Sequence, residues 1–190
     1  MISSVRRRCG NALAEYVRIA AKALGRERIA KEPITKPPPQ LPEERSVFWR
    51  SGNEHARRHV LYAIRLARLV AERYDLPLEG CGDFRFVDLK GTAAGVVTTQ
   101  GRSYFIELDL RYRGDFIGTL AVLAHEFAHV FLARAGVRLA YKRGNEELTD
   151  TVAALAGFGP VMKKACERVH TQSLIVVSVT TTRYLGYLRR

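Results

Sequence analysis

The segment Leu120–Ala133 (LAVLAHEFAHVFLA) constrains the fold of this chain more than any other part of the sequence. Its apolar residues cover almost every face of a helix, and such a helix is expected in the interior of a protein. Two histidines and a glutamate nevertheless lie within it. A carboxylate buried among apolar side chains is costly unless it is paired, protonated or close to a metal ion. The segment therefore predicts a buried helix over Asp115–Ala135 whose polar side chains serve a function.

The spacing of the polar residues in this helix is typical of a metal site. His125 and His129 are four residues apart, so they lie on one helical face, one turn from each other. Two imidazoles placed in this way can bind one Zn²⁺ ion at about 2.0–2.1 Å. Glu126 directly follows His125, where a glutamate can take a proton from a water molecule at the metal. The pattern predicts one zinc ion per chain, with Glu126 as the catalytic base.

A second motif, NEELTD, opens the next expected helix, Asn145–Phe158. Its residues Glu146 and Asp150 are four apart and share a helical face. The sequence HEFAH followed by NEELTD resembles the gluzincin metallopeptidases, the thermolysin-like clan, whose pattern is HExxH followed by NExxxD on a second helix. The resemblance covers His125–Asp150. The short chain looks like the minimal intracellular type, such as the ImmA/IrrE-type proteases of bacteria.

The resemblance implies a role for each acidic residue of the second motif. Glu146 would be the third zinc ligand. Asp150 would accept a hydrogen bond from a ligand histidine, which fixes the tautomer of the imidazole and raises its basicity. Glu147 is the competing third ligand. Glu146 is preferred because Thr151, and not an acidic residue, lies four positions after Glu147.

Three protein ligands favour a catalytic over a structural role for the zinc. A structural zinc site is normally closed by four protein ligands, whereas a catalytic site keeps one position for water. The resemblance implies a zinc-dependent peptidase that hydrolyses peptide bonds in an intracellular protein substrate, through a zinc-bound water activated by Glu126. The oxyanion needs a further donor. The sequence leaves the following candidates open: Tyr141, His170, Arg183, Tyr184 and Tyr187.

The order of strands and helices predicts an α+β fold. After a helix over Glu54–Tyr74, strand-like segments precede the two motif helices, and they are Phe84–Leu89, Gly95–Thr99 and Ser103–Asp109. The residues Gln100–Arg102 between the last two predict a hairpin turn. Strands followed by helices indicate the α+β class. The C-terminal segment Ser173–Thr181 has the composition of a strand, with a buried helical segment as the alternative.

The resemblance adds a more specific expectation for the sheet. It implies a zincin-like fold with a small antiparallel sheet, an edge strand before the HExxH helix, and a second, Glu-bearing helix. Ser103–Asp109 would be that edge strand, and a protein or peptide substrate would pair with it in an extended conformation.

Composition and charge divide the chain into three parts. Residues 1–32 form a basic N-terminal extension with an amphipathic helix over Asn11–Leu24, which packs on the main domain, on another subunit or on a different protein. Residues 33–42 (PITKPPPQLP) predict an extended, stiff linker. Residues 43–190 would form the zincin-like metallopeptidase domain. The first 42 residues carry nine basic and three acidic side chains, hence +6 of the total net charge of +12.

This charge supports a rival function. In the rival reading the protein is a basic binding module for nucleic acid or an acidic protein, and its zincin-like zinc site is catalytically silent. Under the peptidase hypothesis, the N-terminal arm would bind a protein partner, and nucleic acid would be a secondary partner.

The sequence also predicts a cytoplasmic protein. The cysteines Cys9, Cys81 and Cys166 are odd in number and widely spaced, which is typical of a reducing compartment. The uncharged run Val169–Thr182 is too short to span a bilayer. The N-terminus has a basic start without the apolar core of a signal peptide.

Overall fold

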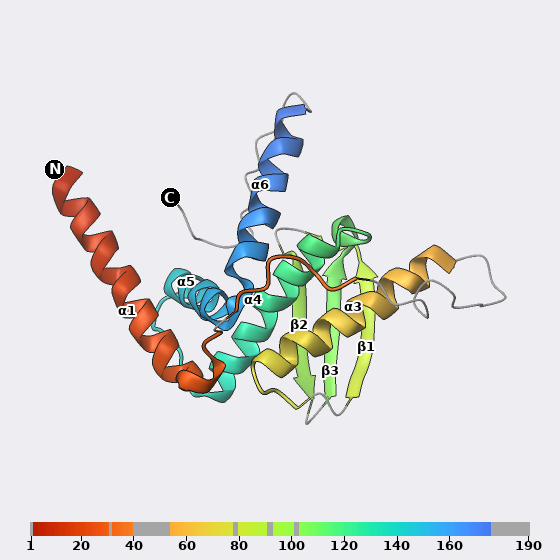
Figure 1. Ribbon diagram of the computed structural model, residues 1–190, viewed down its shortest axis with the longest axis horizontal. Helices are drawn as coiled ribbons and strands as arrows, with labels where there is room; N and C mark the ends of the chain where they lie inside the picture. The colour runs from red at the N-terminus through yellow and green to blue at the C-terminus, as the bar shows by residue number, and fades with distance from the viewer. Residues whose placement is uncertain are drawn as a thin grey trace.

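A computed structural model describes residues 2–30, 32–39, 54–77, 80–90, 93–100 and 103–175 (Figure 1). The elements, in chain order, are α1 (Ile2–Arg28), α3 (Glu54–Arg73), β1 (Gly80–Val87), β2 (Gly95–Gln100), β3 (Ser103–Asp109), the 3₁₀ turn η1 (Leu110–Tyr112), α4 (Phe116–Arg134), α5 (Lys142–Ala153), the π-helical turn η2 (Ala154–Phe158) and α6 (Gly159–Ile175). Helices combined with one small sheet agree with the predicted α+β class.

The sheet differs from the expected one in two respects. Its strand order is β1-β3-β2. β2 and β3 are antiparallel, with Gln100 opposite Ser103 as the predicted hairpin requires, but β1 and β3 are parallel. The prediction of an antiparallel sheet with Ser103–Asp109 at its edge is therefore wrong: the sheet is mixed, β3 is its central strand, and β2 is an edge strand. The reason is that the chain passes from β1 beyond the position of β3 before the hairpin brings β3 back between them.

Helix α4 is the centre of the molecule. It packs against β2 on one side and against α3, α5 and α6 on the others, and Figure 1 shows it running through the middle of these elements. Asp115 caps its first turn by accepting a hydrogen bond from the Gly118 amide at 3.1 Å. Because its neighbours surround it, the apolar residues on nearly all its faces are buried. The predicted buried helix is confirmed, with ends at Phe116 and Arg134.

By length and composition, α4 also resembles a membrane-spanning helix. Among the described residues, α4 alone is long and apolar enough to cross a membrane, with 19 residues and a mean hydropathy of 1.6. However, 61% of this window is buried inside the protein. Such burial is typical of the core helix of a soluble protein.

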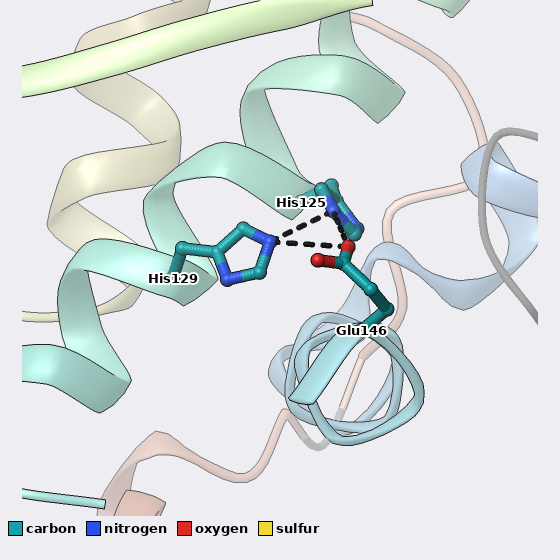
Figure 2. Close-up of side chains that lie close together, drawn as sticks. All are labelled: His125, His129 and Glu146. Carbon is teal, nitrogen blue, oxygen red and sulfur yellow. Dashed lines mark hydrogen bonds and ion pairs between the residues drawn. The ribbon is translucent and has the colours of Figure 1, made fainter. Parts of the chain in front are cut away.

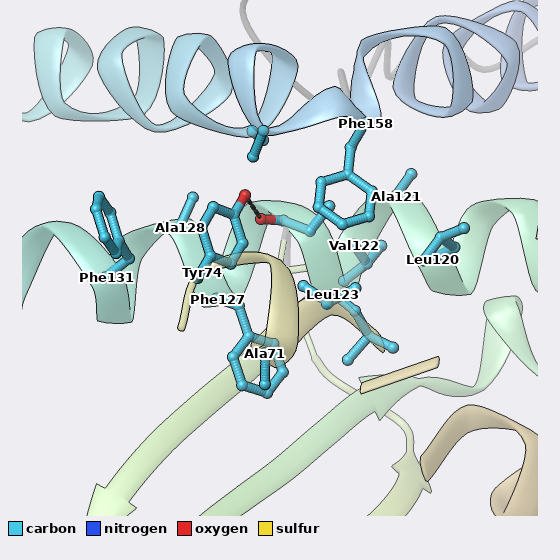
Figure 3. Close-up of a cluster of buried hydrophobic side chains, with 14 of the residues drawn as sticks. Ala71, Tyr74, Leu120, Ala121, Val122, Leu123, Phe127, Ala128, Phe131 and Phe158 are labelled. Atoms are coloured by element: carbon cyan, nitrogen blue, oxygen red, sulfur yellow. Dashed lines mark hydrogen bonds between the residues drawn. The ribbon is translucent and has the colours of Figure 1, made fainter. Parts of the chain in front are cut away.

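A cluster of buried side chains joins α3, α4 and η2 around Tyr74 (Figure 3). The Tyr74 ring is stacked on Phe131 with centroids 5.6 Å apart and lies 6.1 Å from the ring of Phe158. Its hydroxyl donates a hydrogen bond to the Ala124 carbonyl at 2.9 Å. Tyr74 therefore fixes the end of α3 against the middle of α4, one residue before His125.

The N-terminal helix packs on the main body of its own chain. Helix α1 is longer than the predicted Asn11–Leu24 and contacts α5 and η2. Its buried residues are Tyr16, Ala20 and Leu24. Leu13 and Val17, from the predicted apolar stripe, are 50% and 40% exposed. Of the three packing partners considered from the sequence, the described residues show the main domain.

The described part of the proline-rich segment, residues 33–39, is bound to the rest of the protein through its backbone. The Ile34 amide donates to the Gly157 carbonyl at 2.7 Å, and Lys164 donates to the Thr35 carbonyl at 2.8 Å. Farther on, Tyr62 and Arg65 of α3 donate to the Pro38 and Pro39 carbonyls. The segment therefore links η2 and α6 to α3 (Figure 1).

Gly157 is required where the chain before the proline-rich segment passes η2. Its φ is +100°, and a Cβ atom there would lie 2.7 Å from the Cβ of Ala30. Only glycine combines this backbone conformation with such a close approach.

The strand predicted near the C-terminus is wrong where the structure describes it, and the helical alternative is correct there. Helix α6 continues to Ile175, so Ser173–Ile175 are helical because they extend the hydrogen bonding of α6. The remaining residues of the predicted strand, 176–181, lie outside the described part of the chain.

Two leucines of α1 that differ in burial, Leu24 and Leu13, test whether this helix is part of the folded core. We expect Leu24→Ala to lower the free energy of unfolding by about 2–5 kcal/mol, because a fully buried leucine leaves a cavity. The control Leu13→Ala removes a half-exposed side chain and should change it by no more than about 0.5 kcal/mol. Urea unfolding followed by circular dichroism measures both. Equal effects of the two variants would show that α1 does not pack as described.

Candidate metal centre

Three side chains with metal-binding atoms converge between α4 and α5 (Figure 2). His125 and His129 project from α4, and Glu146 projects from α5 toward both. Glu146 Oε2 lies 3.2 Å from His125 Nε2 and 3.4 Å from His129 Nε2. The two Nε2 atoms are 3.1 Å apart.

The size of this triangle fits a metal ion. Ligands placed tetrahedrally about 2.0–2.1 Å from a zinc ion are themselves about 3.3 Å apart. The three distances between the donor atoms lie between 3.1 and 3.4 Å, so these atoms can form one face of such a tetrahedron. Two imidazole nitrogens and a carboxylate oxygen are also a donor set that suits zinc and several other divalent ions. The three residues therefore lie close enough to bind one metal ion, and the geometry leaves its identity open.

Asp150 contacts His125 at Nδ1, the ring nitrogen that does not face the other two ligand atoms. Its Oδ1 lies 2.8 Å from His125 Nδ1, and its side chain is completely buried. A carboxylate can only accept, so Nδ1 carries a proton and the Nε2 lone pair is available to a metal. Burial lowers the pKa of His125, but hydrogen bonds to Asp150 and Glu146 outweigh it and raise the value to about 10. Without a metal, His125 therefore keeps a proton on Nε2 as well, and a bound metal would replace that proton.

Thr149 contacts the second histidine. Its Oγ1 lies 3.1 Å from His129 Nδ1. Burial, and then the charge of His125, lower the pKa of His129. The sequence analysis did not single out Thr149. Its position three residues after Glu146, which places both on one face of α5, was the available signal.

Glu126 lies beside the three ligands and is not one of them. Burial raises its pKa to about 7, with the charge of His125 opposing the shift and that of Glu146 adding to it. Glu126 follows Val122 by one helical turn, and Val122 Cγ1 lies 2.6 Å from where a Cβ at Gly95 would be. Glu126 is therefore on the side of α4 that faces β2. A carboxyl group with a pKa near neutrality is suited to accept and return a proton.

Glu147, the competing ligand, points elsewhere. Its Oε1 accepts a hydrogen bond from Arg143 Nε at 3.0 Å. It also acts on Tyr16 of α1, whose pKa is raised by burial and by hydrogen bonds with Tyr141 and Glu147. Of the two neighbouring glutamates, only Glu146 lies with the histidines.

The oxyanion donor is not identified among the described side chains. Tyr141 is 54% exposed, and its hydroxyl is 2.7 Å from that of Tyr16 at the contact between α1 and α5. The other four candidates, His170, Arg183, Tyr184 and Tyr187, have side chains outside the described part of the structure. The same holds for Cys9 and Cys81, whereas Cys166 is a half-buried thiol on α6 whose pKa is raised mainly by burial.

Comparisons of the chain with models of known protein families, with curated proteins and with solved structures found no match.

Metal stoichiometry tests the three-residue site directly. We expect about one zinc ion per chain in the wild type, and loss of the metal in His129→Ala and Glu146→Ala, because each variant removes one of three ligands. Glu147→Ala is the matched control and should keep its metal, since the neighbouring carboxylate faces Arg143. Elemental analysis after zinc loading and gel filtration gives the ratios. Full metal content in Glu146→Ala would contradict the site.

Proposed function

We propose that the protein is a zinc-dependent peptidase of the gluzincin-like type, acting on protein substrates in the cytoplasm. The observation that carries this proposal is the combination of three converging ligands with a buried carboxyl group, Glu126, that is left over for catalysis. Within the described part of the chain, no fourth histidine, cysteine or carboxylate belongs to this cluster. A closed structural zinc site would normally have a fourth protein ligand.

The site is accessible on one side. The side chains of His129 and Glu146 are 36% and 23% exposed, whereas that of His125 is 15% exposed. The buried side is occupied by Asp150. A substrate can therefore approach the ligand triangle from the side of His129.

In this proposal the residues of the chain have separate tasks. When bound, a Zn²⁺ ion would supply a Lewis acid that polarises a peptide carbonyl and lowers the pKa of water. Glu126 accepts a proton from the attacking water and then donates it to the leaving amine, so the proton balance closes. Asp150 holds the His125 ring so that its Nε2 faces the other two ligand atoms.

In this proposal the substrate pairs with a different strand from the one expected, because the sheet is mixed. β3 has neighbours on both sides, whereas β2 pairs with β3 only, among the described strands. β2 packs against α4, and Glu126 lies on that side of the helix. An extended peptide could therefore pair with the main chain of β2 and pass close to Glu126.

The arrangement of the two motifs supports the gluzincin-like assignment. Helices α4 and α5 pack together, and the second and last residues of the NEELTD segment, Glu146 and Asp150, both reach His125. These are the partners that the resemblance implies for those positions. The rival function, a basic binding module with a catalytically silent zinc site, is compatible with the same geometry. The two functions differ in whether the site hydrolyses peptide bonds.

Glu126→Gln separates the two functions. We expect this variant to keep the zinc content of the wild type, because Glu126 is not a ligand, and to lose at least about 100-fold in turnover, because an amide cannot serve as a general base. Cleavage of a mixture of unfolded proteins, followed by mass spectrometry of the new termini, is the measurement. Chelation should abolish cleavage and zinc should restore it.

The control is Glu147→Gln, a change of the same chemistry on the neighbouring helix, which should leave turnover unchanged. Equal cleavage by wild type and Glu126→Gln would exclude the proposed role of Glu126. Absence of cleavage by the zinc-loaded wild type on every substrate tried would favour the silent-site alternative.

A further inference from the structure

The Nδ1 atoms of the two ligand histidines contact different groups. His125 Nδ1 contacts the Asp150 carboxylate, whereas His129 Nδ1 contacts the hydroxyl of Thr149 at 3.1 Å. Thr149 is completely buried, and it lies on α5 between Glu146 and Asp150. A buried hydroxyl placed on the far nitrogen of a ligand needs an explanation beyond the packing of its methyl group.

The tautomer of His129 decides whether it can bind a metal. A neutral imidazole carries one proton, on either Nδ1 or Nε2, and the nitrogen without the proton is the one that can act as a ligand. His129 Nε2 faces His125 Nε2 and Glu146 Oε2. The proton must therefore be on Nδ1 for the three donor atoms to act together, and a group that accepts a hydrogen bond from Nδ1 favours that form.

The hydrogen bonds of Thr149 make it such an acceptor. A hydroxyl has one proton to donate and two lone pairs to accept with. Thr149 Oγ1 lies 2.7 Å from the main-chain carbonyl of Asn145, to which it donates. With its proton committed there, the same oxygen can only accept at His129 Nδ1.

The carbonyl that takes this proton is held in place by its own residue. The Asn145 side chain accepts from the Leu139 amide at 2.8 Å and donates to the Leu139 carbonyl at 2.8 Å. It also donates to the Tyr141 carbonyl at 3.1 Å. These bonds fix the start of α5 to the loop that follows α4, so the orientation of the Thr149 hydroxyl is set by a rigid partner.

We propose that Thr149 is a positioning residue that holds His129 in the Nδ1–H tautomer and thereby strengthens metal binding at Nε2. The proposal rests on the metal site of the proposed function and is independent of turnover. Its chemical basis is that partners of the far imidazole nitrogen orient the ring and raise the basicity of the ligand nitrogen.

Helix α5 offers a matched control for the test. Thr151 Oγ1 donates to the Glu147 carbonyl at 2.7 Å, the same bond to the preceding turn that Thr149 makes, and Thr151 is also buried. Thr149→Val and Thr151→Val therefore remove the same kind of hydrogen bond from the same helix. Only the first also removes the contact with a ligand histidine.

Zinc affinity, measured by competition with a chromophoric chelator, is the first readout. We expect Thr149→Val to weaken zinc binding by about 10–100-fold, the usual cost of losing a partner of a metal ligand. Thr149→Ser, which keeps the hydroxyl, and Thr151→Val should stay within about threefold of the wild type, a margin below that cost. Wild-type affinity in Thr149→Val would overturn the proposal, as would equal losses in both valine variants.

The second readout needs no variant. ¹⁵N NMR of the imidazole nitrogens in the metal-free wild type reports which nitrogen of His129 is protonated. The proposal requires the proton on Nδ1, and a proton on Nε2 with Nδ1 accepting from Thr149 would overturn it. If the zinc-loaded protein cleaves nothing, the peptidase proposal fails, and both readouts still decide the role of Thr149.

Discussion

The buried contact between His125 and Asp150 is the interaction on which the rest of the site depends. Asp150 has no exposed surface, and a carboxylate in that position is costly unless a hydrogen-bonded partner stays in place. His125 is that partner, and it lies on α4, which packs against α3, α5, α6 and β2. The pair stays together only if α5 stays packed against α4.

Other parts of the chain support this packing. Tyr74 fixes the α4 main chain one residue before His125. Helix α1 covers α5, and the proline-rich segment is bound to η2, which directly follows α5.

Helix α5 serves the metal centre with one face and the N-terminal helix with another. Glu146, Thr149 and Asp150 face α4, whereas Glu147 pairs with Arg143 and acts on Tyr16 of α1. Consecutive residues of an α-helix point about 100° apart, so a rotation of α5 by one position would exchange the two glutamates. The buried residues Leu148 and Val152 lock the rotation that is observed. The packing of α1 on α5 thus contributes to the choice of ligand, although α1 supplies none of the three ligand atoms.

Features that lie within a single helix could be predicted from the sequence. The apolar surroundings of His125 and His129 predicted a buried helix with the correct ends to within one residue, and the four-residue spacing of Glu146 and Asp150 predicted a shared face. Relations between distant segments were not predictable in this way. The alternation of Tyr104, Ile106 and Leu108 shows that one face of β3 is buried, but it is the same for a central strand and an edge strand. The role proposed for Thr149 depends on its contact with His129, which lies on a different helix. The sequence around a helical threonine does not predict such a contact. The strand expected over Ser173–Thr181 is wrong for Ser173–Ile175, because α6 continues through these residues.

The charges of the centre favour the binding of a cation. Glu146 and Asp150 are both in contact with His125, and the charges of His125 and Glu146 affect the pKa of Glu126. Burial holds the pKa of Glu126 near 7, so this third carboxyl group is partly ionised at neutral pH. A single proton shared with His125 offsets one of these negative charges, which is the reason that the pKa of that histidine rises to about 10. The charge that remains is negative and largely withdrawn from water, and a divalent cation at the ligand triangle would balance it while displacing the proton. Since Glu126 would then lie beside a stronger positive charge, its carboxylate form would be favoured, which is the form that a general base requires.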